Sequence, residues 1–126
     1  MAEPVMDDET AETVAGVVRL LRRAGEVAWV RADREGPRST HQLVALGIDL
    51  VAGETRNLLA DGVDMAGPTP AGEDEVGLLR SAEQLLGRIT GVPAAADARR
   101  LRARVADLVG GKHQCPRLTD AHQANC

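Results

Sequence analysis

The stretch STHQLVALGIDLVAGETRNLLA, residues 39–60, is the most apolar segment of this chain and decides the expected fold. At about 100° per residue, its apolar positions cover more than half of a helix surface. Only Gln42, Asp49 and Arg56 keep a narrow side polar. Because such a helix needs neighbours on several sides, the pattern predicts that residues 39–60 form the central helix of a bundle. The apolar positions are Leu43, Val44, Leu46, Ile48, Leu50, Val51, Leu58 and Leu59.

Three other segments repeat apolar residues three and four positions apart, which is typical of amphipathic helices. They cover residues 8–32, 70–90 and 93–109. In the first of them, one seam is formed by Val14, Val17, Leu21, Ala24 and Ala28. Ser39 is the expected cap of the second helix and Thr69 that of the third, while the pair Gly110-Gly111 is expected to end the fourth. We therefore predict an all-α protein, an antiparallel up-and-down four-helix bundle. A three-helix core with one loosely docked helix is the alternative. One domain would span residues 1–111, followed by a flexible, irregular tail at 112–126.

Composition excludes several classes of function. The chain of 126 residues has no Phe and no Tyr, so its core must be aliphatic, and Trp29 is its one aromatic residue. A net charge of −4 with mixed signs argues against a nucleic-acid binder. No segment approaches the roughly 20 apolar residues of a membrane span, and the amino terminus lacks the pattern of a secretory signal. Two cysteines are too few for a disulfide framework. We expect a cytoplasmic protein.

The helical segments contain few side chains suited to catalysis. Ser39 is a helix cap rather than a nucleophile, and we predict no catalytic residue and no cofactor. On a helical wheel Glu54 falls between Leu50 and Leu58, where a carboxylate must find a partner or raise its pKa. It would either anchor a small molecule in an interior pocket or pair with an arginine while partly exposed. The candidate binding residues are Glu54, Arg56, Trp29 and His41.

The last fifteen residues hold more reactive side chains than the helices do. Their two imidazoles and two thiols are donors that zinc accepts. The spacing H-x-C-x6-H-x3-C matches no common zinc finger, so we predict no resident metal. A disulfide between the two cysteines is the second alternative, although a reducing cytoplasm opposes it. The candidate ligands are His113, Cys115, His122 and Cys126.

Gly110-Gly111, followed by a short end with Thr119, Cys115 and Cys126, resembles the leader–core border of ribosomally made, modified peptides. This resemblance implies that a protease-transporter cuts after the glycine pair and that residues 112–126 are the core. It also implies dehydration of Thr119, its linkage to Cys115 or Cys126, and decarboxylation at the terminal cysteine.

Apolar surface in excess of what a small bundle needs, together with the scarcity of catalytic side chains, favours protein binding. The leading hypothesis is a non-enzymatic accessory or regulatory module that binds a protein partner or itself, as a homodimer, through an apolar helix face. It would bind neither nucleic acid nor membrane. The alternatives are the modified-peptide precursor and a small-molecule-binding bundle that uses Glu54.

Overall fold

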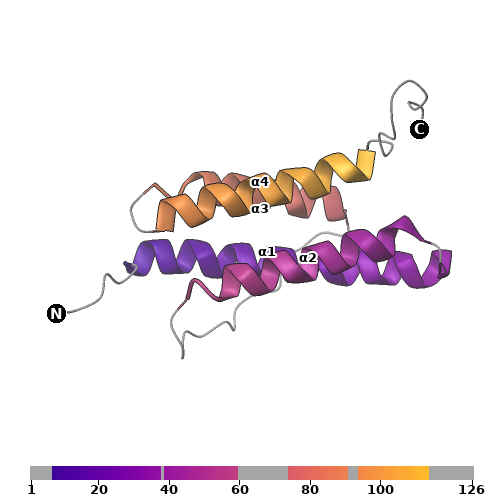
Figure 1. Ribbon diagram of the computed structural model, residues 1–126. Helices are drawn as coiled ribbons and strands as arrows, with labels where there is room; N and C mark the ends of the chain where they lie inside the picture. The colour runs from indigo at the N-terminus through magenta and orange to yellow at the C-terminus, as the bar shows by residue number, and fades with distance from the viewer. Residues whose placement is uncertain (1–6, 38, 60–73, 91–93, 114–126) are drawn as a thin grey trace, which may run out of the picture.

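The computed structural model describes residues 7–37, 39–59, 74–90 and 94–113, and it consists of four helices (Figure 1). They are α1 (Asp8–Glu35), α2 (Thr40–Arg56), α3 (Glu75–Gly87) and α4 (Ala94–His113). No strand occurs in these described ranges, so the prediction of an all-α bundle is confirmed. Within the same ranges, no helix combines the length and the apolar character that crossing a membrane requires.

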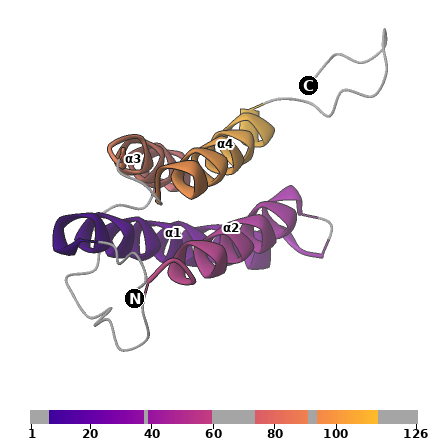
Figure 2. The same cartoon turned by 60° about the vertical axis from the view of Figure 1, so that its left-hand side comes forward.

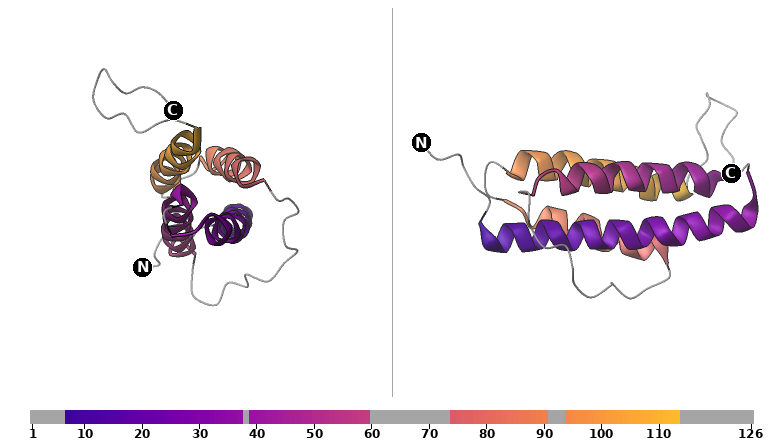
Figure 3. Two further views of the ribbon diagram at one scale, coloured as in Figure 1. Left: turned by 90° about the vertical axis from the view of Figure 1, so that its right-hand side faces the viewer. Right: turned by 90° about the horizontal axis from the view of Figure 1, so that it is seen from below.

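The four helices stand at the corners of a square when the bundle is seen end-on (Figure 3, left). Both α1 and α4 contact α2 and α3. Helices α1 and α4 run one way and α2 and α3 run the other, so that each contacting pair is antiparallel (Figures 1 and 2). Because α2 and α3 point the same way and lie on a diagonal, the directions do not alternate along the chain as in a simple up-and-down bundle.

The core is aliphatic and follows the periodicity of the sequence. The predicted seam of the first helix, Val14, Val17, Leu21, Ala24 and Ala28, is fully buried. It packs against the stripes of the other helices, which are rich in leucine, valine and alanine. The α1–α2 contact is close at Gly25, where an added Cβ would lie 2.9 Å from Asp49 Oδ1 and 3.4 Å from Ile48 Cγ2. A small residue at this position therefore lets the two helices approach each other.

Several helix ends differ from the sequence-based prediction. Helix α1 continues past Ala32 to Glu35, because its first interruption is Gly36 with a φ of +96°, a conformation that favours glycine. Helix α2 ends at Arg56 rather than near residue 60. The backbone N–H groups of Leu58 and Leu59 bond three residues back, which tightens the chain into a final turn.

The third and fourth helices also have different bounds. Helix α3 begins at Glu75 and ends at Gly87, and the expected cap at Thr69 lies outside the described residues. Helix α4 runs through Gly110-Gly111 to His113, so the prediction that this pair ends the helix is wrong. Glycine lowers helix propensity by about 1 kcal/mol relative to alanine, but it readily adopts helical φ and ψ angles.

The prediction that residues 39–60 form an enclosed central helix is also wrong. Ala45, Ile48 and Val51 of α2 are buried, but Leu43 is 72% exposed, Leu46 46% and Leu50 62%. In a square bundle each helix has only two neighbours, which cover one side of it. The apolar surface of α2 is wider than two neighbours can cover, so part of it faces outward.

Candidate functional site

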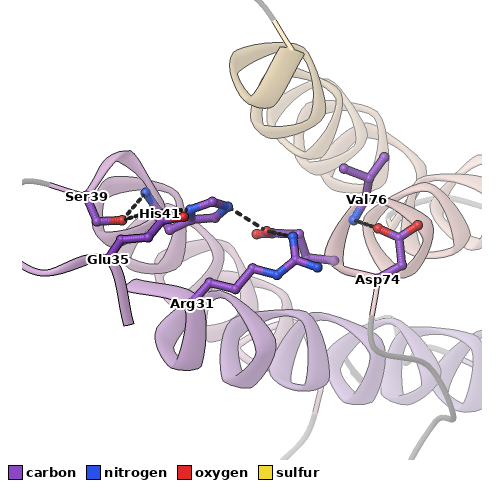
Figure 4. A network of polar contacts seen from close by, with 7 residues as sticks. Arg31, Glu35, Ser39, His41, Asp74 and Val76 are labelled. Atoms are coloured by element: carbon purple, nitrogen blue, oxygen red, sulfur yellow. Dashed lines mark hydrogen bonds and ion pairs between the residues drawn. The ribbon is translucent and has the colours of Figure 1, made fainter. Parts of the chain in front are cut away.

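A fully buried carboxylate, that of Glu75, joins three helices through its contacts with Arg31 and His41, which Figure 4 labels. Its Oε1 atom lies 3.4 Å from the Arg31 guanidinium of α1 and 3.2 Å from Nε2 of His41 of α2. The other ring nitrogen of His41, Nδ1, lies 2.7 Å from the Glu35 carboxylate. Ser39 Oγ also donates a hydrogen bond to Glu35. We call Arg31, Glu35, His41 and Glu75 the end cluster.

The imidazole of His41 lies between two carboxylates of the end cluster. Its Nε2 atom faces Glu75 and its Nδ1 atom faces Glu35, so the ring connects the start of α2 to α3 and to the end of α1. Arg31 and the imidazole of His41 both contact the buried carboxylate of Glu75. Such pairing is required because an isolated carboxylate without solvent contact would cost several kcal/mol. The end cluster therefore holds the ends of α1, α2 and α3 together.

Local structure explains why Glu75 points inward. Asp74 caps α3 by accepting a hydrogen bond of 3.2 Å from the Val76 backbone N–H, which makes Glu75 the first helical residue. Glu75 lies three and seven positions before the buried Leu78 and Ala82, on the same helical stripe. The burial of Glu75 is not predicted from the sequence, where this residue follows two other acidic residues, Glu73 and Asp74. Its spacing from Leu78 and Ala82 is the signal that identifies it.

The predicted site residue Glu54 lies in a second charged cluster, on the surface between α2 and α4. Its Oε1 atom accepts a hydrogen bond of 3.0 Å from Arg100, and Arg104 contacts both of its carboxylate oxygens. Arg100 also pairs with Asp97 at 3.6 Å. The hydrogen bonds from Arg104 and then Arg100 lower the pKa of Glu54. Its side chain is 37% exposed, so this is a surface ion pair that links two helices.

Trp29, another predicted site residue, bridges α1 and α2. Its indole Nε1 donates a hydrogen bond of 2.9 Å to the carboxylate of Asp49. The same carboxylate lies against Gly25, so the aspartate is held between Trp29 and the backbone of α1. Sequence reasoning assigns Asp49 only to the polar side of its helix, because a bond between helices cannot be inferred from the periodicity of one.

The four predicted binding residues do not form one site. His41 lies in the first turn of α2 and Glu54 near its end, which separates them by roughly 20 Å along the helix. Arg56 lies in the last turn of α2, where its charge complements the helix dipole. Trp29 contacts the middle of α2 through Asp49. Each residue therefore has a separate local environment.

The side chains proposed as zinc ligands lie outside what the structure describes; only the backbone of His113 belongs to α4. Within the described ranges, no three His, Cys, Asp or Glu side chains are grouped so that they could hold a metal ion. The glycine pair of the leader–core hypothesis lies inside α4. Processing after Gly111, and the chemistry of residues 114–126, stay predictions.

A row of three leucines on α2 is the most exposed apolar feature of the described residues. Leu43, Leu46 and Leu50 lie three and four positions apart, which places them on one side of the helix, opposite the buried Ile48 and Ala52. We call these three residues the leucine stripe. Sequence reasoning assigns them to the core, because the hydrophobic pattern gives the width of an apolar surface and not the number of neighbours that cover it.

No protein-family model, curated protein or solved structure matches this chain. The function proposed below therefore rests on the geometry of the chain itself.

Proposed function

We propose that this protein is a small non-enzymatic helical module, which serves as an accessory or regulatory component by binding a protein through the leucine stripe. The observation that carries the proposal is the exposure of Leu43, Leu46 and Leu50 on one side of α2. Exposed leucines scattered singly are ordinary in proteins, whereas a contiguous apolar row on one helix marks an interaction surface.

The charges of α2 support this proposal. No Asp, Glu, Lys or Arg occurs in α2 before Asp49, and Asp49 is bonded to Trp29. The charge of Glu54 is likewise bound to Arg100 and Arg104. A partner that covers the leucine stripe therefore does not have to desolvate an unpaired charge near Leu43 or Leu46, a step that would oppose binding.

The area of the stripe indicates a weak and reversible contact. Burying a leucine side chain completely contributes about 1.5–3 kcal/mol. Covering three leucines that are 46–72% exposed would therefore contribute on the order of 3–5 kcal/mol before the entropy of association is subtracted. A contact of this size suits a regulated interaction better than a permanent one.

The proposal that the protein is not an enzyme is supported by its charged clusters, whose residues are engaged in contacts between helices. The end cluster joins α1, α2 and α3, and the ion pairs of Glu54 with Arg100 and Arg104 join α2 to α4. The open depression of about 280 Å³ between α3 and α4 is lined by Arg99 and Arg102, and Glu54 is not among its lining residues. A cytoplasmic location belongs to the same proposal.

Photo-crosslinking in the native host tests this function. A photoreactive amino acid at Leu46 should form an adduct with a protein, because Leu46 is at the centre of the stripe. The matched control is Val30, which is 49% exposed on α1 and lies outside the stripe. Adducts from position 46 and none from position 30 are expected. Equal yields from both positions, or no adduct from either, would contradict the proposal.

A further inference from the structure

We infer that the depression between the end of α3 and the first half of α4 binds a small aliphatic carboxylate, whose charge is held by Arg99 and Arg102. The inference is carried by two arginines that have no carboxylate partner, by an apolar floor beside them and by the volume of the depression. It concerns α3 and α4, so it goes beyond the function proposed for the leucine stripe of α2 and does not depend on it.

Two arginines of α4 line this depression. Arg99 and Arg102 are three positions apart, which places them on the same side of the helix. Among the residues that the structure describes, neither forms an ion pair, whereas Arg100 and Arg104 are bound to Glu54. A guanidinium group donates two parallel hydrogen bonds to the two oxygens of a carboxylate. The two free arginines therefore suit an anionic ligand.

The charge around the depression has the opposite sign to the charge of the whole chain. The chain carries a net charge of −4, but residues 88–104 contain five arginines and a single acidic residue, Asp97, which pairs with Arg100 at 3.6 Å. A local positive surface concentrates small anions even on an acidic protein. The five arginines are Arg88, Arg99, Arg100, Arg102 and Arg104.

Gly87, the last residue of α3, keeps Arg102 in place. An added Cβ at Gly87 would lie 3.1 Å from both Cζ and Nη1 of Arg102, so the guanidinium lies against the backbone of α3. Its charge there complements the carboxyl end of the helix dipole. A guanidinium that is already held loses less conformational entropy when a ligand binds. A small residue at position 87 therefore positions one of the two anion-binding groups.

The floor of the depression is apolar. Leu86 is 1% exposed and Ile89 7%, and Ala95 of α4 adds a methyl group beside them. Inorganic phosphate would contact the arginines and leave this floor in water, whereas an aliphatic chain would cover it and gain from its burial. Trp29, the one aromatic residue of the chain, is not among the lining residues, so a nucleobase would find no stacking partner there.

The volume limits the length of the aliphatic chain. The depression holds about 280 Å³, just below the roughly 300–1,000 Å³ of sites for drug-sized ligands. A short-chain carboxylate such as hexanoate fits this space, whereas a nucleotide or a long-chain fatty acid exceeds it. A ligand with so few atoms should bind weakly, with a dissociation constant of about 1 mM.

Titration of the isotope-labelled full chain with hexanoate, followed by amide NMR chemical shifts, tests the inference. Saturable shifts should concentrate in residues 86–90 and 94–102. Arg99→Gln and Arg102→Gln should each raise the dissociation constant at least about tenfold, because each removes a charge-assisted hydrogen bond. The matched control is Arg22→Gln, which removes an exposed arginine of α1 outside the depression and should leave the dissociation constant unchanged.

Two further variants test the shape of the site without removing a charge. Ala95→Leu places a larger side chain in the depression and should abolish saturable binding. Gly87→Ala should weaken binding about threefold or more, because the new Cβ displaces the guanidinium of Arg102. Gly53→Ala on α2, where no atom lies within 4 Å of an added Cβ, is the matched control and should bind as the natural chain does. Circular dichroism verifies that all variants remain helical.

Shifts that do not saturate up to about 50 mM hexanoate would overturn the inference. So would an equal loss of affinity in Arg22→Gln and Arg99→Gln, since general attraction between charges would then explain the binding. Inorganic phosphate or neutral hexanamide that binds as tightly as hexanoate would overturn the ligand class. Each of these results leaves the crosslinking test of the leucine stripe unaffected.

Discussion

Among the residues that the structure describes, Glu75 has the charged side chain most completely removed from solvent, so its stability in the folded chain depends on its ion-pair partners. It has no exposed side-chain surface, whereas Arg31 is 42% exposed. Breaking a buried ion pair usually costs 3–5 kcal/mol, and a partner that reaches solvent reduces this loss. We therefore expect Glu75→Gln to lower the free energy of unfolding by about 2–4 kcal/mol. Urea unfolding followed by the fluorescence of Trp29 measures it.

Glu26→Gln is the matched control for this change. Glu26 pairs with Arg23 on the surface of α1, where its side chain is 65% exposed. Exposed pairs contribute about 0–1 kcal/mol, so this variant should unfold almost as the natural chain does. Equal effects of the two substitutions would show that the end cluster does not stabilise the bundle.

The ion pair of Glu54 should make the free energy of unfolding depend on pH. Hydrogen bonds from Arg104 and Arg100 hold the pKa of Glu54 below its usual value, so the folded state favours the carboxylate more than the unfolded chain does. Its stabilising contribution is complete above the unfolded pKa of about 4.3 and is lost as the pH falls through the lower folded pKa. The urea midpoints of the natural chain and Glu54→Gln should therefore differ at about pH 7, and the difference should shrink as the pH falls below about 4.

Arg104→Gln tests the cause of that dependence. Because Arg104 contributes most to the shift at Glu54, the arginine variant should lose most of the same pH-dependent contribution. Combining the two substitutions should add little to either one alone. Fully additive effects would mean that the two side chains stabilise the bundle independently.

At the scale of the helices, we expect alanine substitutions at two glycines to have opposite effects on stability. Gly53 is exposed on α2 with no atom within 4 Å of an added Cβ, so Gly53→Ala should stabilise the chain by about 0.5–1 kcal/mol through helix propensity. Gly25 lies at the α1–α2 contact, where an added Cβ would meet the Asp49 carboxylate at 2.9 Å. Gly25→Ala should therefore lower the melting temperature while Gly53→Ala raises it.

A stabilising Gly25→Ala would contradict this close contact. The Trp29 fluorescence spectrum offers a second readout, since moving Asp49 disturbs its bond to the indole. Gly53→Ala should leave that spectrum unchanged.

The sequence predicts the helices better than it predicts their ends. The burial of the seam from Val14 to Ala28 is predicted correctly, because apolar residues spaced alternately three and four positions apart indicate the buried face of a helix. The end of α4 is not predicted correctly, because a glycine pair often ends a helix but can also continue it, as it does here. Pairs such as Glu75–His41 also escape prediction, because they join residues far apart in the sequence.

At the scale of the molecule, the sequence predicts a bundle but not which face of each helix is covered. Leu46 and Ile48 are both apolar, yet the first is half exposed and the second is fully buried. The difference depends on the positions of α1 and α4 around α2, which hydrophobic periodicity alone does not fix. The positions of α1 and α4 decide which leucines of α2 are buried in the core and which are exposed to a partner. The proposed function depends on this difference.

The unfolding free energy of a triple variant, Leu43→Gln, Leu46→Gln and Leu50→Gln, tests most directly whether the leucine stripe is surface or core. Urea denaturation at a protein concentration of about 1 μM measures it. The matched control is Leu79→Gln, a substitution in the buried core. We predict that the triple variant stays folded and unfolds within about 1 kcal/mol of the natural chain, while the single core variant loses about 3 kcal/mol or more. A triple variant that is unfolded, or that loses more stability than Leu79→Gln, would contradict the arrangement of the bundle and the function proposed for α2.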